Sequence, residues 1–402
     1  KLVADRFAAL IRRVSEKQSK RVVILVDEYD KPILDNLENT FLAGTLRDGL
    51  KDFYSVLKES DAYIRFCFIT GVSKFSRVSI FSDLNNLEDI SLDPKFGDIC
   101  GYTEKELTTV FADRLDGIDV NELRHWYNGY SFLGKNRVYN PFDVLLFFKK
   151  QALGNYWFES ATPSFLINLL RDNRIFVPNL DGTEVGEAAL SSFTIDHLLP
   201  ETVLFQSGYL TIKEKFTVGP RRFFRLGFPN QEVRLSFTDA LLAEYTQSRA
   251  PQAGLQNTMY RALEQRDMDR VHSTLQSLFS AIPAEWYTRN NMDRYEGYYA
   301  SVIYAFLASL GFDLRPEEST SHGRCDLVVD TGDIVYVMEF KVTELTGDGQ
   351  KALAQIRERG YHHSYVQAGR EVVLVGMDFS RKERNLTGFE YEPGNEISTS
   401  LP

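Results

Sequence analysis

Cysteine is scarce in this sequence of 402 residues, which contains only Cys67, Cys100 and Cys325, all far apart along the chain. An odd count without any C-x2-C pair argues against a disulfide framework and shows no metal-type spacing. The simplest interpretation is a protein of a reducing, cytoplasmic environment.

Long apolar runs and an excess of positive charge are also missing. No stretch of about 18 apolar residues occurs, so we expect no transmembrane helix, and no signal peptide follows the first residue. The net charge of -10 argues against a surface coated with basic groups for nucleic acid, although a local basic groove remains compatible with it. Because the sequence starts with Lys1 and not with Met, we expect it to begin inside a longer natural protein.

The composition that is present predicts a folded protein of two or three domains, with 43% hydrophobic and 13% aromatic residues. Residues 2–14 and 41–59 have the apolar spacing of helices. Residues 22–26 and 63–71 are short apolar strands of the kind found in buried parallel sheets. Strand, helix and strand at this spacing predict an α/β unit with a parallel sheet.

The middle of the chain, from about 102 to 215, is predicted to be mainly helical. Residues 216–236 are rich in Gly, Pro and Arg, and we interpret them as a connection between domains. Within this stretch, arginines alternate with phenylalanines, as on some strand-binding surfaces, but a hairpin with a solvated arginine face is favoured; the arginines are Arg221, Arg222 and Arg225.

The C-terminal part predicts the order α-β-β-α-β. A helix ends at Gly311, two strands form a hairpin within 323–342, a helix spans about 348–368, and a strand covers 371–377. His362 and His363 within that helix suggest a metal, but a position on the helix surface is favoured.

Charged residues stand at one end of the predicted hairpin, where apolar residues would be expected. Asp326 precedes one apolar run, and Glu339 and Lys341 end the other. Residues i and i+2 of a strand share a face, so Glu339 and Lys341 converge while Phe340 turns away. If the strands pair, Asp326 lies near Glu339, and two such carboxylates favour a divalent cation such as Mg²⁺ or Mn²⁺. A lysine beside this cation can orient a water for attack on a phosphate.

These residues resemble the motif of the PD-(D/E)XK nuclease superfamily. The segments YEGYYASVIYAFLASLGF, GRCDLVV and QIRERGYHHSY are similar to one branch, found behind an AAA-ATPase-like domain in many bacterial proteins of unknown role. The resemblance implies that Asp326 and Glu339 bind the metal, with the backbone carbonyl of Phe340 as a further ligand, and that Lys341 is the catalytic lysine. It also implies additional catalytic or supporting roles, each with a structural alternative, for Glu296, Gln355, Glu317 and Arg324.

The N-terminal strand VVILVDEYD has the form of a Walker B motif, in which apolar residues precede two acids. In such a strand, Asp27 holds Mg²⁺ through water and Glu28 polarises the attacking water. Segments spread over most of residues 1–237, including FITGVSKFSRVSIF, WYNGYSF and LFQSGYLTI, closely resemble the AAA-ATPase-like family. That resemblance implies that Thr70 or Ser73 is a sensor-like residue near the γ-phosphate, with loop capping as the alternative for Ser73.

A phosphate-binding loop of the form G-x4-G-K-[ST] is missing, and LGKNR at 133–137 lacks the first glycine and the Ser/Thr. The family has this loop upstream of the Walker B strand, which here would precede Lys1. Either the sequence lacks that portion or this protein has lost it. We therefore expect residues 1–402 to hydrolyse ATP poorly or not at all, and ATP to be a cofactor only if the full protein has the loop.

The predicted organisation is an α/β protein in five parts. These are a partial P-loop-type AAA-like core (1–120), a helical extension with a winged helix as one candidate (121–237), a helical connector (238–285), a restriction-endonuclease-like α/β domain (286–390) and a tail (391–402). We expect a Mg²⁺- or Mn²⁺-dependent nuclease, coupled to the AAA-like module, that acts on nucleic acid and specifically DNA. Homo-oligomers through the AAA-like module are one assembly that the resemblance allows. The alternative is a non-catalytic NTP-binding switch or scaffold.

Overall fold

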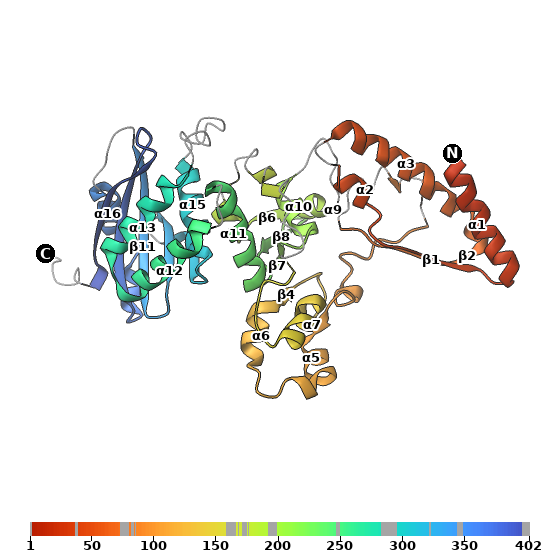
Figure 1. Ribbon diagram of the computed structural model, residues 1–402, viewed down its shortest axis with the longest axis horizontal. Helices are drawn as coiled ribbons and strands as arrows, with labels where there is room; N and C mark the ends of the chain where they lie inside the picture. Colours follow the sequence, from red (N-terminus) through yellow and green to blue (C-terminus); the bar gives the residue numbers. More distant parts are fainter. Residues whose placement is uncertain are drawn as a thin grey trace. The chain divides into compact units, whose positions relative to one another are not determined.

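The computed structural model describes most of the chain, and Figure 1 shows the arrangement of its helices and strands. The described residues are 2–36, 39–72, 80–81, 84, 86–157, 166–167, 169–170, 175, 177–191, 199–246, 250–282, 296–320, 323–343 and 349–395. They divide into two compact units: residues 1–149, 164–169 and 182–229 form the first, and residues 150–163, 170–181 and 230–402 form the second.

The first unit begins with the predicted parallel α/β arrangement. Strand β1 (Val22–Val26) pairs in parallel with β2 (Ile64–Ile69), which confirms the parallel strands expected from the sequence. Helix α1 (Leu2–Gln18) packs on α3 (Thr40–Glu59) through stacked rings of Phe7 and Phe53, 4.6 Å apart. The short helix α2 (Lys31–Leu34) follows β1, and the 3-10 helix η1 (Asp61–Tyr63) precedes β2.

The middle of the chain contains more strand than expected. Its described residues contain two three-stranded sheets, with the orders β3-β5-β4 and β6-β8-β7. Most of these strands have only two or three residues, too few to show a period of two in the sequence. The elements are β3 (Tyr102–Thr103), α5 (Glu104–Val110), α6 (Val120–Tyr127), β4 (Asn128–Tyr130), β5 (Val138–Tyr139), α7 (Pro141–Lys150), β6 (Glu184–Gly186), α9 (Glu187–Ser191) and α10 (Pro200–Gln206), with 3-10 helices η2 (Pro94–Phe96), η3 (Ala112–Arg114) and η5 (Val177–Leu180).

The segment interpreted as a connection is instead largely a hairpin of β7 (Thr211–Val218) and β8 (Arg221–Gly227). The Gly219-Pro220 turn, which suggested a linker, joins two paired strands, and the division between the compact units follows Pro229. Two arginines of β8 form ion pairs with acids, which agrees with the solvated arginine face: Arg222 with Glu187, and Arg225 with Glu184 and Glu214.

The second unit is built on a five-stranded sheet of order β13-β12-β11-β10-β9. Strands β10 (Gly323–Asp330) and β11 (Ile334–Thr343) form the predicted antiparallel hairpin, and β12 (Glu371–Ser380) runs parallel to β11. The edge strands β9 (Asp313–Thr320) and β13 (Asn385–Pro393) were not predicted, and β13 includes part of the predicted tail.

Helices cover both faces of this sheet. On one face, Leu353 and Ile356 of α16 (Gln350–Arg359) pack with Val335, Val337 and Leu374. On the other face, Phe379 contacts Phe279 of α13 (Met268–Ser280) and Tyr299 of α15 (Glu296–Ala308).

The region predicted as a connector forms three helices of the same compact unit: α11 (Gln231–Thr246), α12 (Ala250–Gln265) and α13. The Tyr336 hydroxyl donates to the Leu263 carbonyl of α12, which ties this helix to the sheet. The helix expected over 348–368 is two helices, α16 and α17 (His363–Gln367), because Gly360 ends α16 in the left-handed conformation with φ 61°. Within the described residues, no helix is long and apolar enough to span a membrane.

Candidate active site

The charged end of the β10–β11 hairpin brings Asp326 and Glu339 together. The last paired residues of the two strands are Leu327 and Met338, and Asp326 is the next residue along β10. Its Oδ2 accepts a hydrogen bond of 2.8 Å from the Phe340 backbone N–H. The side chain of Asp326 therefore occupies the position where β10 leaves β11, directly beside Glu339.

Glu339 has a buried carboxylate, of which one oxygen is hydrogen-bonded and the other is not. The residue is 1% exposed. Its Oε1 lies 3.3 Å from the Lys341 ammonium and accepts a hydrogen bond from the Gln355 amide of α16. Its Oε2 is buried and has no hydrogen-bond partner among the described residues. A buried carboxylate oxygen without a partner costs free energy, so this atom is a candidate metal ligand.

The electrostatics of Glu339 support the same interpretation. Burial and the negative charge of Asp326 raise the pKa of Glu339 to about 7, and Lys341 opposes that increase. A divalent cation would compensate for both effects, because it attracts two carboxylates that otherwise repel. The donor set of carboxylate oxygens suits Mg²⁺ or Mn²⁺.

Lys341 and Phe340 lie on opposite faces of β11, as the period of a strand requires. The Lys341 side chain is 34% exposed, so its ammonium group reaches solvent at the side of Glu339. Phe340 is buried and its ring lies 6.4 Å from that of Phe379. The Lys341 ammonium group, two carboxylates and a water-accessible surface therefore lie together at one end of the sheet.

Three further residues expected at the site are placed by their backbone alone. Glu296 is the first residue of α15, Glu317 lies on β9 and Arg324 lies on β10. Their side chains are outside the described part, so their roles remain predictions, as does the metal contact of the Phe340 carbonyl. The described side chains contain no group of three or more His, Cys, Asp or Glu suited to a metal ion.

Two residues near the site were missed by the sequence analysis. Tyr361 is buried and shares a hydrogen bond with Gln355, the residue that donates to Glu339. Asp378 on β12 is 2% exposed and is the register partner of Lys341 on β11. An acid inside the otherwise apolar segment VVLVGMDFS was the sequence signal for Asp378.

The two histidines after Tyr361 differ in their surroundings. His363 is exposed, whereas His362 is 1% exposed, so the expected surface position is wrong for His362. Burial, with the neighbouring His363, lowers the pKa of His362 to about 4.

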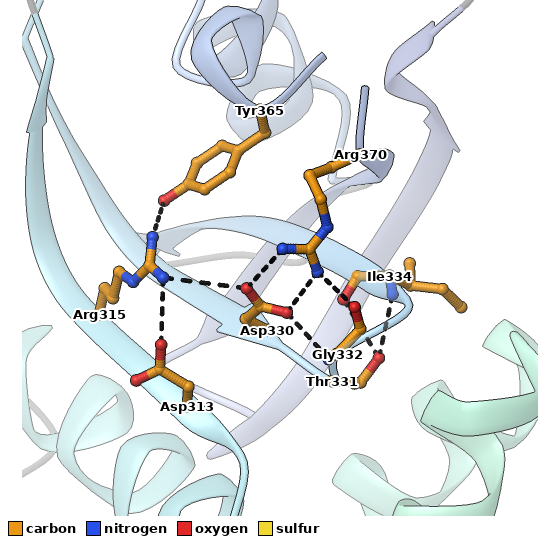
Figure 2. Close-up of polar contacts among 8 residues, drawn as sticks. All are labelled: Asp313, Arg315, Asp330, Thr331, Gly332, Ile334, Tyr365 and Arg370. Carbon is orange, nitrogen blue, oxygen red and sulfur yellow. Dashed lines mark hydrogen bonds and ion pairs between the residues drawn. The ribbon is translucent and has the colours of Figure 1, made fainter. Parts of the chain in front are cut away.

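The opposite end of the same hairpin contains a different polar cluster, centred on Asp330 (Figure 2). Arg370 donates to both carboxylate oxygens of Asp330 and to the Gly332 carbonyl, and Arg315 forms an ion pair with Asp330 at 3.8 Å. Arg315 also donates to the Tyr365 hydroxyl. Because every charge in this cluster is matched, we interpret it as a structural clamp on the hairpin turn.

The predicted nucleotide-site residues of the first unit meet at the carboxyl ends of β1 and β2. The Thr70 hydroxyl donates to Asp27 Oδ1 at 2.6 Å and accepts from the Glu28 backbone N–H at 3.2 Å. Glu28 has the left-handed φ of 51°, an uncommon conformation for a residue with a side chain. Asp30, which was not predicted, is fully buried and accepts from the Val72 N–H at 3.0 Å. Ser73 lies outside the described residues.

Comparisons with known proteins agree with both regions. A family model for a predicted AAA-ATPase matches residues 1–81, and a model of the PD-(D/E)XK nuclease superfamily matches residues 294–388. A protein of Azotobacter chroococcum mcd 1, described as an uncharacterized protein in the vnfD 5' region, is 46% identical over 387 residues. That match covers 96% of this chain and 75% of the relative.

Proposed function

Because the chain belongs to the family that joins a predicted AAA-ATPase domain to a domain of the PD-(D/E)XK nuclease superfamily, we propose that it is a metal-dependent nuclease acting on DNA. The observation that supports this most strongly is the state of Glu339. Its buried carboxylate lies beside Asp326. One oxygen is bound by Lys341 and Gln355, and the other has no hydrogen-bond partner among the described residues.

In this proposal, Asp326 and Glu339 hold the divalent cation, and the Phe340 carbonyl adds a ligand. When bound, the cation supplies positive charge that stabilises the phosphate oxygens as the phosphodiester is cleaved. The hydrogen bond from Gln355 fixes the orientation of the Glu339 carboxylate, so that Oε2 is the oxygen left for the metal.

Lys341 is the residue that acts on the water. Its ammonium group is partly exposed and lies 3.3 Å from Glu339 Oε1, so it can donate a hydrogen bond to a water at the same surface. Lysine is a compact charge with three donors, which suits it to orient a nucleophile while it also attracts the phosphate.

The AAA-like region is proposed to gate or position cleavage. Asp27, Glu28 and Thr70 form one hydrogen-bonded group at the ends of parallel strands, where nucleotides commonly bind in α/β sheets. ATP would act there only together with a phosphate-binding loop, which these 402 residues lack. If such a loop is supplied, ATP should change the rate of DNA cleavage, and Glu28→Gln should alter that response.

The first test is cleavage of labelled single-stranded, duplex and branched DNA in Mn²⁺, Mg²⁺ or EDTA. We expect metal-dependent products with the wild type and a loss of about 100-fold or more with Lys341→Ala or Asp326→Ala. Lys382→Ala, at an exposed lysine in the turn after β12, is the control and should cleave normally. Cleavage that continues in EDTA, or in both site variants, would contradict the proposal.

A non-catalytic scaffold is the second candidate, favoured by the acidic composition of these residues, whose net charge of -10 opposes binding of nucleic acid. Metal titration separates the two functions. If the paired carboxylates bind Mn²⁺, the folded protein should become more stable with the logarithm of the Mn²⁺ concentration above the Kd, whereas a scaffold without the metal site gains little. No cleavage together with no thermal stabilisation by Mn²⁺ would favour the scaffold.

A further inference from the structure

Asp378 joins strand β12 to the start of helix α16. It is 2% exposed, and its Oδ2 accepts a hydrogen bond of 2.9 Å from the Gly349 backbone N–H. Gly349 is the N-cap residue of α16, has a φ of 80° and gives the helix no side-chain cap. The Asp378 carboxylate therefore satisfies a backbone donor next to the helix, where a negative charge is also favourable.

Two glycines without side chains, Gly349 and Gly376, allow the backbone of the helix to pack directly against the strand. A Cβ at Gly376 would lie 2.4 Å from the Gly349 carbonyl oxygen and 2.5 Å from the Leu353 nitrogen. A Cβ at Gly349 would lie 2.8 Å from the Gly376 oxygen. This backbone-to-backbone approach leaves little room for adjustment, so the Asp378 contact fixes where α16 begins relative to β12.

The same helix contains Gln355, which donates to Glu339. Leu353 and Ile356 are buried in the core on the α16 face of the sheet, so Gln355 has little freedom to move independently of the helix. Gly376 and Asp378 are the register partners of Glu339 and Lys341, which places all four residues next to one another on two adjacent strands.

We propose that Asp378 is a positioning residue for the nuclease site: through Gly349 it sets the position of α16 and thereby the contact of Gln355 with Glu339. The effect of Asp378 on kcat that this inference predicts rests on the proposed nuclease function. The essential property is a hydrogen-bond acceptor, because Oδ2 has the Gly349 contact while Oδ1 has no partner among the described residues. The uncharged acceptor of Asn should therefore suffice.

The kinetic test compares Asp378→Ala, Asp378→Asn and Gln355→Ala in the full chain with Mn²⁺. We expect Asp378→Ala to lower kcat about tenfold with KM changed less than about twofold, and Asn to restore kcat to within about threefold of the wild type. The double variant Asp378→Ala/Gln355→Ala should be no more than about twofold worse than the poorer single variant, because both remove the same contact. Losses that multiply, or an Asn variant as impaired as Ala, would overturn the proposal.

A second measurement needs no cleavage and so separates this inference from the proposed function. In the metal-free protein, hydrogen exchange should be faster for the first-turn amides of α16 in Asp378→Ala than in the wild type or Asp378→Asn. Exchange in α12 should be unchanged. Equal exchange of α16 in all three proteins would refute the positioning role, whether or not the wild type cleaves DNA. A wild type that never cleaves but shows the expected exchange pattern would contradict the nuclease and leave the role of Asp378 in place.

Discussion

At the scale of single residues, the burial of Glu339 beside Asp326 makes its ionised form unfavourable. Its folded-state pKa of about 7 exceeds the ordinary 4.5, so ionisation destabilises the metal-free fold; this cost is absent below pH 4.5 and complete above pH 7. We therefore expect Glu339→Gln to raise the free energy of unfolding by about 2 kcal/mol in EDTA at pH 8. Mn²⁺ should then raise the melting temperature of the wild type but not of the variant.

Thermal unfolding with and without Mn²⁺ measures both effects. Glu383→Gln is the matched control, because Glu383 is an exposed glutamate in the turn after β12. It should leave the melting temperature and the Mn²⁺ response unchanged. If Glu339→Gln is less stable than the wild type in EDTA, the carboxylate stabilises the metal-free fold, which would contradict the prediction.

His362 gives the opposite pH dependence. Its pKa of about 4 in the fold lies below the ordinary 6.5, so the unfolded chain binds the proton more tightly. The stability that this neutral histidine allows is present above pH 6.5 and is lost as pH falls towards 4, at up to about 1.4 kcal/mol per pH unit.

Urea unfolding between pH 4.5 and 7.5 should therefore show a weaker pH dependence for His362→Leu than for the wild type. An exposed histidine outside this pair, His125 of α6, provides the control, since His125→Gln should retain the wild-type slope. If the slopes of His362→Leu and wild type coincide, other groups cause the acid sensitivity.

At the scale of elements, the β10–β11 hairpin is held at both ends by charged groups of different purpose. At the turn, Asp330 is bound by Arg370 through two hydrogen bonds, and Arg370 also binds the Gly332 carbonyl (Figure 2). We expect Arg370→Lys to lower the melting temperature by a few degrees, because one ammonium group does not reproduce this planar set of contacts. Metal-dependent cleavage should persist, since the clamp lies at the other end of the hairpin from Asp326.

Thermal melts and the DNA cleavage assay together test this separation of roles. Lys351→Ala, at an exposed position of α16, should change neither. Loss of cleavage in a folded Arg370→Lys protein would contradict the assignment of the cluster as structural.

The hairpin and the paired acids could be predicted from the sequence because their signals are local. An apolar run, a Thr-Gly-Asp turn and a second apolar run define β10 and β11, and the period of two places Glu339 and Lys341 on one face. The edge strands were missed because their strand character depends on pairing. β9 contains Pro316 among charged residues, and β13 mixes Gly and Glu with its aromatics, so neither shows a clear alternation.

The contacts of the site depended still more on tertiary structure. The sequence predicts Asp326, Glu339 and Lys341 as catalytic residues, but the burial of Glu339 follows from α16 covering that face of the sheet. Asp378 and Gly349 are 29 positions apart, and no spacing rule connects an acid in a strand to a helix N-terminus at that distance. Tyr361 is close to Gln355 in the sequence, but Gly360 ends α16 between them, so helical spacing did not predict their contact.

At the scale of the whole molecule, the proposed nucleotide site and the proposed nuclease site lie in different compact units, so we expect each to act without the other. In the proposed nucleotide site, Asp27, Glu28 and Thr70 would supply the Walker B part, but no G-x4-G-K-[ST] motif is present in these 402 residues to bind the phosphates. We expect phosphate release from ATP by this chain to equal that of Glu28→Gln. ATP should also leave its melting temperature and its Mn²⁺-dependent DNA cleavage unchanged.

Each outcome of that experiment has a distinct physical meaning. Asp27 and Glu28 are exposed, so Glu28→Gln should fold as the wild type does and is a clean comparison. ATP hydrolysis that Glu28→Gln abolishes would mean that backbone amides and cations elsewhere in the chain replace the missing loop. Without such hydrolysis, the DNA cleavage proposed for Asp326, Glu339 and Lys341 should depend on the divalent cation alone. Any control by nucleotide would then require the phosphate-binding loop to be supplied together with the Walker B strand.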